Sequence, residues 1–224
     1  MDRIGFEMCG RVRLSSDVSE IKLVFSIPPH RPTPNFPPSW NVAPTDSLPV
    51  VRYDAKAGER SLDALRWGLV PFWAKDLNVG FANINAKAEG IETRPAFREA
   101  FQRRRCLVPV NSFYEWKKTG TGKQPYAIAL ADHSLMALAG LWENWRSPAG
   151  EWLRSFAIIT TEPNAGGPQT RVLARLAWRG SRRLVRAEGP ARAVSVRGND
   201  LLAGERAGRK RENNDPGLIE PIAA

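Results

Sequence analysis

The run Cys106-Leu107-Val108-Pro109-Val110-Asn111-Ser112-Phe113-Tyr114-Glu115-Trp116 decides the fold class of this chain. Its β-branched and aromatic side chains are typical of a β-strand. Similar short runs, separated by polar turns such as Thr119-Gly120-Thr121-Gly122, lie on both sides of it, at residues 48–53, 65–70, 126–130, 135–141 and 156–160. The sequence therefore predicts a strand-rich fold.

Two short helices are expected beside these strands. Ser16 or Asp17 is suited to cap a helix that ends near residue 25, because both side chains accept hydrogen bonds from backbone N–H groups. A second helix, over residues 93–103, places two aromatic rings on one face, those of Phe97 and Phe101. Strands and helices together predict a single compact, strand-rich α+β domain with a few short helices.

The composition fits one domain. The 224 residues are 42% hydrophobic and include eight tryptophans, which is ample for one sizeable core. No run of about 18 apolar residues appears, and the start MDRIGFEMCGR lacks the apolar run of a secretory signal. We therefore expect a cytoplasmic protein of the bacterial type without a membrane segment. The two cysteines, Cys9 and Cys106, lack the spacing of a disulfide framework or a zinc site, and we expect neither metal nor cofactor.

The basic charge is concentrated in residues 166–212. The net charge of the chain is +10, and this segment contributes +8 of it, from 12 Lys+Arg and 4 Asp+Glu. The segment contains no Ile, Phe or Tyr but 7 of the 18 glycines, so we expect it to pack poorly. Residues 213–222 then resume the pattern of a turn followed by an apolar strand. Two interpretations stay open: a disordered basic loop, or a stretch read in a shifted frame and then restored.

Cys9 directly follows Met8. Translation that starts at Met8, followed by removal of that methionine, leaves Cys9 with a free α-amine beside its thiol. Such a 1,2-aminothiol captures an aldehyde, because the amine condenses to an imine and the thiol then adds and closes a five-membered ring. Residues 1–7 would block the amine, so we expect this leader to be absent from, or removed in, the mature protein. The alternative is that Cys9 is an ordinary buried cysteine.

Glu115 is flanked by three aromatic rings. Strand alternation places Glu115 and Phe113 on one face, with Tyr114 and Trp116 on the other. An apolar setting raises the pKa of a carboxyl group and suits it to proton transfer near neutrality. The alternative is a solvated glutamate on the polar face of an edge strand.

The stretch Asn83-Ile84-Asn85-Ala86-Lys87-Ala88-Glu89 predicts a strand with an unusually polar face. On that face Asn85 can hold a substrate hydroxyl or carbonyl group, and Lys87 can meet a phosphate. The alternative is a solvent-facing strand with routine cross-strand pairs. Trp67, Phe72 and Trp73 offer surfaces for stacking on unpaired bases, unless they belong to the core.

Seven motifs follow one another along residues 8–165 and 213–222: Met8-Cys9-Gly10-Arg11, Asn41-Val42-Ala43-Pro44, Arg66-Trp67-Gly68-Leu69-Val70-Pro71, Asn83-Ile84-Asn85-Ala86-Lys87-Ala88-Glu89, Phe113-Tyr114-Glu115-Trp116-Lys117, Ile158-Ile159-Thr160-Thr161, and Asn214-Asp215-Pro216 with Leu218-Ile219-Glu220-Pro221. In content and order they resemble the SOS response-associated peptidase (SRAP) family, also called abasic site processing proteins.

The resemblance implies a strand-dominated α+β fold with a basic groove for single-stranded DNA. In that family the N-terminal cysteine forms a thiazolidine with the ring-opened sugar of an abasic site and shields the lesion from strand cleavage. Carried over by motif, Cys9 is the nucleophile, Glu115 is the general acid and base, and Asn85 positions the reacting sugar. The family is also credited with removing its own leading residues, which agrees with the expected loss of residues 1–7.

The same resemblance implies a set of DNA contacts. Residues that match the family's contacts to DNA or sugar are Arg11, Asn41 and Thr160, and those that match its base-wedging aromatics are Phe72 and Trp73. Lys87 stands where arginine is usual, so the charge is kept but the bidentate phosphate fork is lost.

One histidine of the family has no counterpart here. It belongs to a His-Asp-Arg-Met-Pro-like motif about ten residues after the strand that holds Thr160, where this chain reads Gln169-Thr170-Arg171-Val172-Leu173-Ala174-Arg175. No histidine follows His133, and both His30 and His133 are expected at the surface. Since the family histidine helps to open the sugar ring and to reverse the link, its absence implies slow crosslinking or failure to release.

Three functions compete at this stage. The leading hypothesis is a monomeric sensor in the DNA damage (SOS) response that crosslinks to abasic sites in single-stranded DNA. The second is a thiol peptidase, a hydrolase acting on peptides in trans. The third is a noncovalent basic DNA-binding protein that relies on residues 166–212.

Overall fold

The computed structural model describes residues 10–119, 122–161, 171–172, 191–195 and 214–216. Their elements, in chain order, are β1 (Val12–Leu14), α1 (Val18–Val24), β2 (Ser39–Val42), β3 (Ser47–Asp54), β4 (Glu59–Trp67), the 3-10 helix η1 (Leu77–Asn83), β5 (Asn85–Lys87), α2 (Arg98–Arg103), β6 (Arg105–Val110), β7 (Ser112–Thr119), β8 (Gly122–Leu130), β9 (Met136–Arg146), β10 (Trp152–Thr161), β11 (Arg171–Val172) and β12 (Ala191–Ser195). The predicted strand-rich α+β fold with a few short helices is confirmed.

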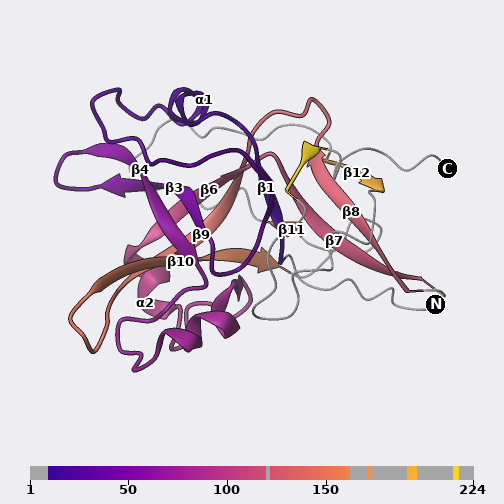
Figure 1. Cartoon of the computed structure of the whole chain (residues 1–224). Helices are drawn as coiled ribbons and strands as arrows, with labels where there is room; N and C mark the ends of the chain where they lie inside the picture. The colour runs from indigo at the N-terminus through magenta and orange to yellow at the C-terminus, as the bar shows by residue number, and fades with distance from the viewer. Residues whose placement is uncertain (1–9, 120–121, 162–170, 173–190, 196–213, 217–224) are drawn as a thin grey trace.

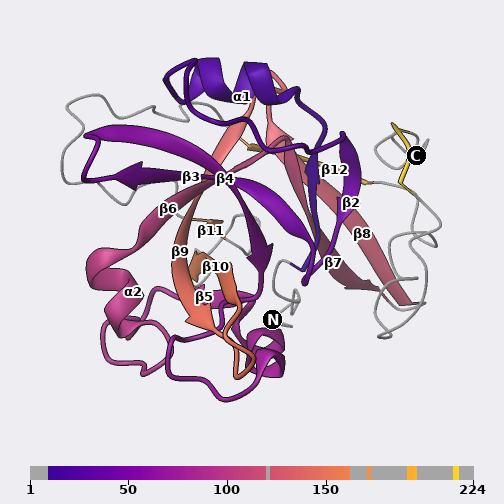
Figure 2. The same ribbon diagram turned by 60° about the vertical axis from the view of Figure 1, so that its left-hand side comes forward.

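The described strands form two sheets (Figure 1). One is open, with the strand order β12-β8-β7-β1-β2. The other has the order β11-β10-β4-β3-β6-β9, and because β9 also pairs with β10, the five strands from β10 to β9 close into a barrel. Figure 2 shows the open sheet and the barrel beside each other, with α1 above them. Helix α2 packs against β6 and β9 of the barrel.

The run at residues 106–116 is two strands, and the prediction of one continuous strand is wrong. Strands β6 and β7 lie on either side of Asn111 and belong to different sheets. Asn111 fixes this junction, because its Oδ1 accepts hydrogen bonds from the backbone N–H groups of Ser15 and Ser16 at 2.8 and 3.0 Å. The change of sheet places Glu115 in the open sheet rather than in the barrel.

Both predicted helices are present, and the second is shorter than expected. The Asp17 side chain caps α1 by accepting a hydrogen bond from the Ser19 N–H at 2.7 Å. Helix α2 starts only at Arg98, because a turn precedes it, closed by the Phe97 N–H bond to the Arg94 carbonyl at 3.0 Å. Phe97 and Phe101 still pack in one hydrophobic cluster, as their spacing predicts.

Two further predicted strands have different bounds in the structure. The strand predicted at residues 65–70 belongs to β4, which begins earlier, at Glu59, and ends at Trp67, because Gly68 takes a φ of 115° and turns the chain away. The polar strand expected from residue 83 is reduced to β5, since Asn83 ends η1 and its side chain donates to the Leu69 carbonyl at 3.1 Å.

The larger hydrophobic cluster joins the two sheets. It includes Phe113 of β7 together with Trp67 and Phe156 of the barrel, whose rings stack with centroids 6.2 Å apart. Trp67 is fully buried, and its Nε1 donates to the Ile84 carbonyl at 2.9 Å. The hypothesis that Trp67 stacks on bases is therefore wrong, and its core alternative is confirmed.

Several sequence expectations fall outside the described residues. These are the leader at residues 1–7, Cys9, and most of residues 166–212. Within that segment, β11 pairs with β10 and β12 pairs with β8. Among the described residues, no helix combines the length and the hydropathy that crossing a bilayer requires.

Candidate functional site

Glu115 is a buried carboxyl group without a hydrogen-bond partner in the described part of the chain. Its side chain is 0% exposed, and neither carboxyl oxygen accepts a hydrogen bond there. Desolvation by burial raises the pKa of Glu115 to about 7. The alternative of a solvated glutamate is wrong. A carboxyl group with this pKa can both give and take a proton near neutral pH.

Strand β1, which follows Cys9 in the sequence, lies beside the strand that holds Glu115. It pairs antiparallel with β7, and the Tyr114 N–H donates to the Arg11 carbonyl at 3.0 Å. Arg11 is buried, and its guanidinium group donates to the Gly10 carbonyl at 3.3 Å. Gly10 and Arg11, which directly follow Cys9, therefore lie beside the part of β7 that holds Glu115.

A second group of candidate residues comes from the barrel. The parallel register of β5 with β10 pairs Asn85 with Ile158 and Lys87 with Thr160. Asn85 and Thr160 are buried, whereas Lys87 is exposed. The Thr160 hydroxyl has no hydrogen-bond partner among the described residues. A buried hydroxyl beside an exposed ammonium group suits contacts with a sugar and a phosphate.

Three aromatic side chains lie at the surface near these elements. Phe72 and Trp73, in the loop after β4, are 53% and 52% exposed, so their core alternative is wrong. Phe81 of η1 was not among the predicted residues; it is 53% exposed, and the Arg66 guanidinium lies over its ring, 5.7 Å from the ring centroid. Its signal was an aromatic residue among small and polar neighbours, after Gly80. Such rings near basic groups suit stacking on unpaired bases.

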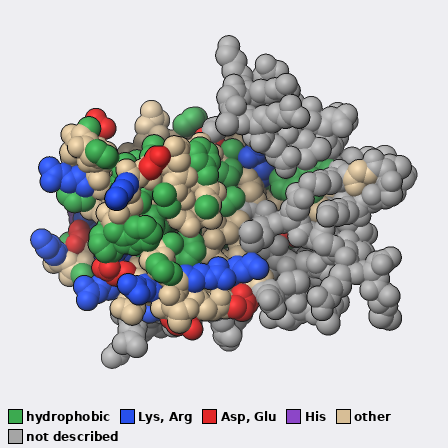
Figure 3. Space-filling model, turned by 90° about the horizontal axis from the view of Figure 1, so that it is seen from below, with side chains coloured by type: hydrophobic (Ala, Val, Ile, Leu, Met, Phe, Trp, Pro, Cys, Tyr) green, Lys and Arg blue, Asp and Glu red, His purple; other side chains and the backbone are tan. Residues whose placement is uncertain are grey.

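Figure 3 shows the molecule from below, the side on which α2 lies in Figure 1. Lys and Arg side chains lie there among hydrophobic ones, with Asp and Glu side chains interspersed. The Lys, Arg and hydrophobic side chains of this face are of the kinds that contact the phosphates and base faces of a single-stranded nucleic acid.

The predicted site residues form two groups. Glu115 lies in β7 of the open sheet, Arg11 directly precedes the neighbouring strand β1, and Asn41, also buried, lies in β2 on the other side of β1. The barrel supplies Asn85, Lys87 and Thr160. The groups border one core, because Phe113 of β7 and Ile158 of β10 belong to the same hydrophobic cluster.

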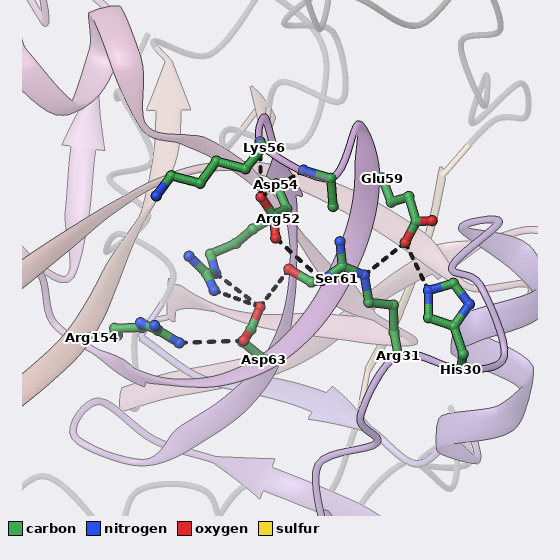
Figure 4. A network of polar contacts seen from close by, with 10 residues as sticks. His30, Arg31, Arg52, Asp54, Lys56, Glu59, Ser61, Asp63 and Arg154 are labelled. Carbon is green, nitrogen blue, oxygen red and sulfur yellow. Dashed lines mark hydrogen bonds and ion pairs between the residues drawn. The ribbon is translucent and has the colours of Figure 1, made fainter.

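Both histidines lie at the surface, as expected. His30 Nε2 lies 3.0 Å from Glu59 Oε2, which also accepts a hydrogen bond from Arg31 at 2.9 Å (Figure 4). His133 occupies the exposed turn between β8 and β9, with a φ of 58°. The described residues contain no group of three or more His, Cys, Asp or Glu side chains that could hold a metal ion.

A family model described as "SOS response associated peptidase (SRAP)" matches residues 8–175. The chain belongs to the SRAP family. The SRAP match spans every predicted site residue, from Cys9 to Thr160, and ends inside the basic segment 166–212. The resemblance inferred from the motifs is confirmed.

Two curated SRAP relatives come from bacteria and animals. Abasic site processing protein YoqW of Bacillus subtilis (strain 168) is 42% identical over 158 residues, which cover 70% of each chain. Abasic site processing protein HMCES of Gallus gallus is 31% identical over 156 residues, which cover 57% of this chain and 46% of the relative.

A solved structure of a protein from Bacteroides thetaiotaomicron is similar to the SRAP fold described here. It has a TM-score of 0.75 at 21% sequence identity, and the match covers 96% of this chain and 100% of the other. A protein from Bordetella bronchiseptica has a TM-score of 0.59 at 20% identity, covering 84% of each chain. These two likenesses concern the fold alone.

Proposed function

We propose that this protein captures abasic sites in single-stranded DNA by a covalent link to Cys9 and so shields the lesion during the DNA damage response. The observation that carries the proposal is the buried carboxyl group of Glu115, which has no hydrogen-bond partner among the described residues and whose pKa is raised to about 7. Glu115 lies in β7, which pairs with β1, and β1 begins three residues after Cys9. The curated relatives add support, because they are named abasic site processing proteins.

The proposed reaction joins the α-amine and thiol of Cys9 to the aldehyde of the ring-opened deoxyribose. The amine adds to the aldehyde carbon, and loss of the hydroxyl group as water gives an imine. The thiol sulfur then adds to the imine carbon, and the nitrogen takes the proton that the thiol releases. One C–N bond and one C–S bond form, one water leaves, and no oxidation or reduction occurs. Glu115 protonates the departing hydroxyl and afterwards takes up a proton as base.

The remaining candidates bind and orient the damaged strand. Asn85 holds a hydroxyl or carbonyl group of the sugar, and Lys87 contacts a phosphate. Further contacts to DNA or sugar come from Arg11, Asn41 and Thr160. The exposed rings of Phe72 and Trp73 stack on, or wedge between, the neighbouring bases.

The mature protein in this proposal begins at Cys9. We infer that the protein itself removes the residues that precede Cys9, Met8 included, since an amide at the Cys9 nitrogen would prevent the imine from forming. It acts as a monomer in the cytoplasm and joins the nucleoid when bound to DNA.

Denaturing electrophoresis with a single-stranded oligonucleotide that carries one abasic site tests the proposal. The wild-type protein is expected to give an adduct that survives denaturation, and Cys9→Ala to give none. Cys106→Ala is the matched control, because Cys106 is a buried core residue with a thiol pKa far above its usual range, and it should retain the adduct. An adduct that persists in Cys9→Ala would refute the assignment.

The word peptidase in the family description supports a second candidate, cleavage of peptides in trans. The two reactions differ in the amine they need, because peptide cleavage by a thiol does not require a free N-terminus. Intact mass spectrometry separates them: a chain that keeps residues before Cys9 and still cleaves peptides favours the peptidase. A complex that dissociates in denaturant, with no adduct, favours the noncovalent DNA-binding alternative.

A further inference from the structure

Asn214 contacts strand β2 across most of the length of the chain. Its Oδ1 accepts hydrogen bonds from the Ser39 hydroxyl at 3.2 Å, the Trp40 N–H at 2.6 Å and the Asn41 N–H at 3.2 Å. Three donors on two consecutive backbone groups and one side chain thus converge on a single amide oxygen. This oxygen fixes the position of the start of β2.

The position of β2 in the sheet explains why such an acceptor is needed. In the order β12-β8-β7-β1-β2, strand β2 is the edge strand, so only one of its sides pairs with another strand. The register of β2 with β1 also shifts here, because Val42 pairs with Val12 and Ser39 with Leu14, so Trp40 and Asn41 together lie opposite Arg13. Such an irregularity interrupts the ladder of hydrogen bonds, and the backbone N–H groups in it require another acceptor. Asn214 supplies it for Trp40 and Asn41.

Trp40 is also bound by a side chain of β7, the strand that holds Glu115. The hydroxyl group of Tyr114, the residue before Glu115, donates to the Trp40 carbonyl at 2.7 Å. Tyr114 and Asn214 therefore bind the same residue of β2, one at its carbonyl group and the other at its N–H group. Strand β1, which leads toward Cys9, lies between β7 and β2.

We infer that Asn214 is a positioning residue of the crosslinking site, which acts by holding β2, and with it Asn41, in register with the strands that lead to Cys9 and hold Glu115. The inference rests on the proposed function. It assigns to the Asn214-Asp215-Pro216 motif a role in the reaction, although Asn214 itself contacts the backbone of β2 rather than any reacting group of the chain.

Single-turnover crosslinking with excess protein over abasic oligonucleotide tests the inference. Asn214→Ala is expected to lower the rate constant of adduct formation roughly tenfold, because all three hydrogen bonds are lost. Asn214→Asp keeps an acceptor oxygen at the same place and is expected to restore a rate near that of the wild type. Asn78→Ala is the matched control, since the Asn78 side chain is exposed and bonds to Asp76 in its own turn.

A double-mutant cycle with Asn41→Ala separates positioning from general stability. If Asn214 acts through β2, Asn41→Ala slows the reaction less in the Asn214→Ala background than in the wild type, because the two changes disturb one element. Additive effects, or equal slowing by Asn214→Ala and Asn214→Asp, would overturn the inference. Should Asn214→Ala lose the fold, Ser39→Ala replaces it; this variant removes one of the three donors and is expected to slow the reaction about threefold.

The outcomes distinguish this inference from the proposed function. No adduct with the wild-type protein would refute the proposed function itself. A Cys9-dependent adduct that forms at the same rate in the wild type and in Asn214→Ala would leave the proposed function intact and refute the role of Asn214.

Discussion

At the residue scale, Glu115 shows why an unfavourable side chain points to function. Burying a carboxyl group without a hydrogen-bond partner destabilises the charged form, and the pKa of about 7 reflects that effect. An apolar residue between Tyr114 and Trp116 would pack at a lower free energy. A carboxyl group kept in such a place is a candidate for proton transfer.

The raised pKa of Glu115 predicts that stability falls as pH rises. Between the ordinary pKa of 4.5 and the folded-state value of about 7, the folded protein holds a proton that the unfolded chain has released. The contribution to the free energy of unfolding therefore declines across this window by about 3 kcal/mol. Glu115→Gln removes this dependence, so its melting temperature should exceed that of the wild type at pH 8 but match it near pH 4.5. Equal melting temperatures at pH 8 would contradict the assigned pKa.

The same substitution predicts a loss of chemistry. Glu115→Gln is expected to slow adduct formation roughly 100-fold or more, because an amide cannot serve as general acid or base. Glu143→Gln is the matched control: Glu143 is also buried, but its carboxyl group pairs with Arg104 at 2.8 Å. Single-turnover rates measured on both variants decide the matter, and comparable slowing in the two would argue against a catalytic role for Glu115.

At the element scale, the approach of β4 to η1 fixes the exposed aromatics. A Cβ atom on Gly80 would lie 2.7 Å from the Gly68 carbonyl oxygen and 3.0 Å from an Arg66 guanidinium nitrogen. The two glycines thus allow the backbone of η1 to lie directly against the chain that leaves β4. This contact holds Phe81 under Arg66, next to the loop of Phe72 and Trp73.

Gly80→Ala is predicted to disturb this contact. The added methyl group should cost about 1–3 kcal/mol, since the atoms it meets include backbone that cannot rotate away, and it should also weaken binding to undamaged single-stranded DNA. Gly58→Ala is the control, because a Cβ atom added to this turn residue would meet nothing within 4 Å. It should lower the free energy of unfolding by only about 1 kcal/mol, through its positive φ, and should bind DNA normally. Thermal melts and fluorescence anisotropy measure both effects. Wild-type DNA affinity in Gly80→Ala would rule out this role for the contact.

The boundaries of elements show where sequence patterns stop being informative. The periodicity at residues 106–116 predicts a strand, and both halves are strands, but nothing local reveals that the chain changes sheets at Asn111. That change depends on hydrogen bonds to Ser15 and Ser16, about 95 residues away in the sequence. Likewise, β4 ends before Gly68, whose φ of 115° turns the chain, and the same glycine approaches Gly80 closely, which is a contact between two elements.

At the scale of the whole molecule, the uneven charge predicts how DNA binding responds to salt. Residues 166–212 carry +8 of the net +10, so the site itself relies on a few local cations such as Lys87. Noncovalent affinity for single-stranded DNA should fall with salt, and Lys87→Ala should lower the slope of log K against log salt by about 0.7. Lys56→Ala, an exposed lysine in the turn between β3 and β4, should leave the slope unchanged. Equal slopes for the wild type and Lys87→Ala would show that Lys87 does not contact a phosphate. A covalent adduct that has already formed should withstand any salt concentration.

The sequence by itself determined the strand-rich class, both helices, the family, and the identity of the candidate residues, because short periodicities and motif order are local properties of the chain. Only the tertiary structure decided that Glu115 is buried, that Trp67 is core while Phe72, Trp73 and Phe81 are exposed, and that Asn214 holds β2. Burial and edge-strand contacts arise when segments distant in sequence pack together. Desolvation, which sets the pKa of Glu115, exists only after that packing has excluded water.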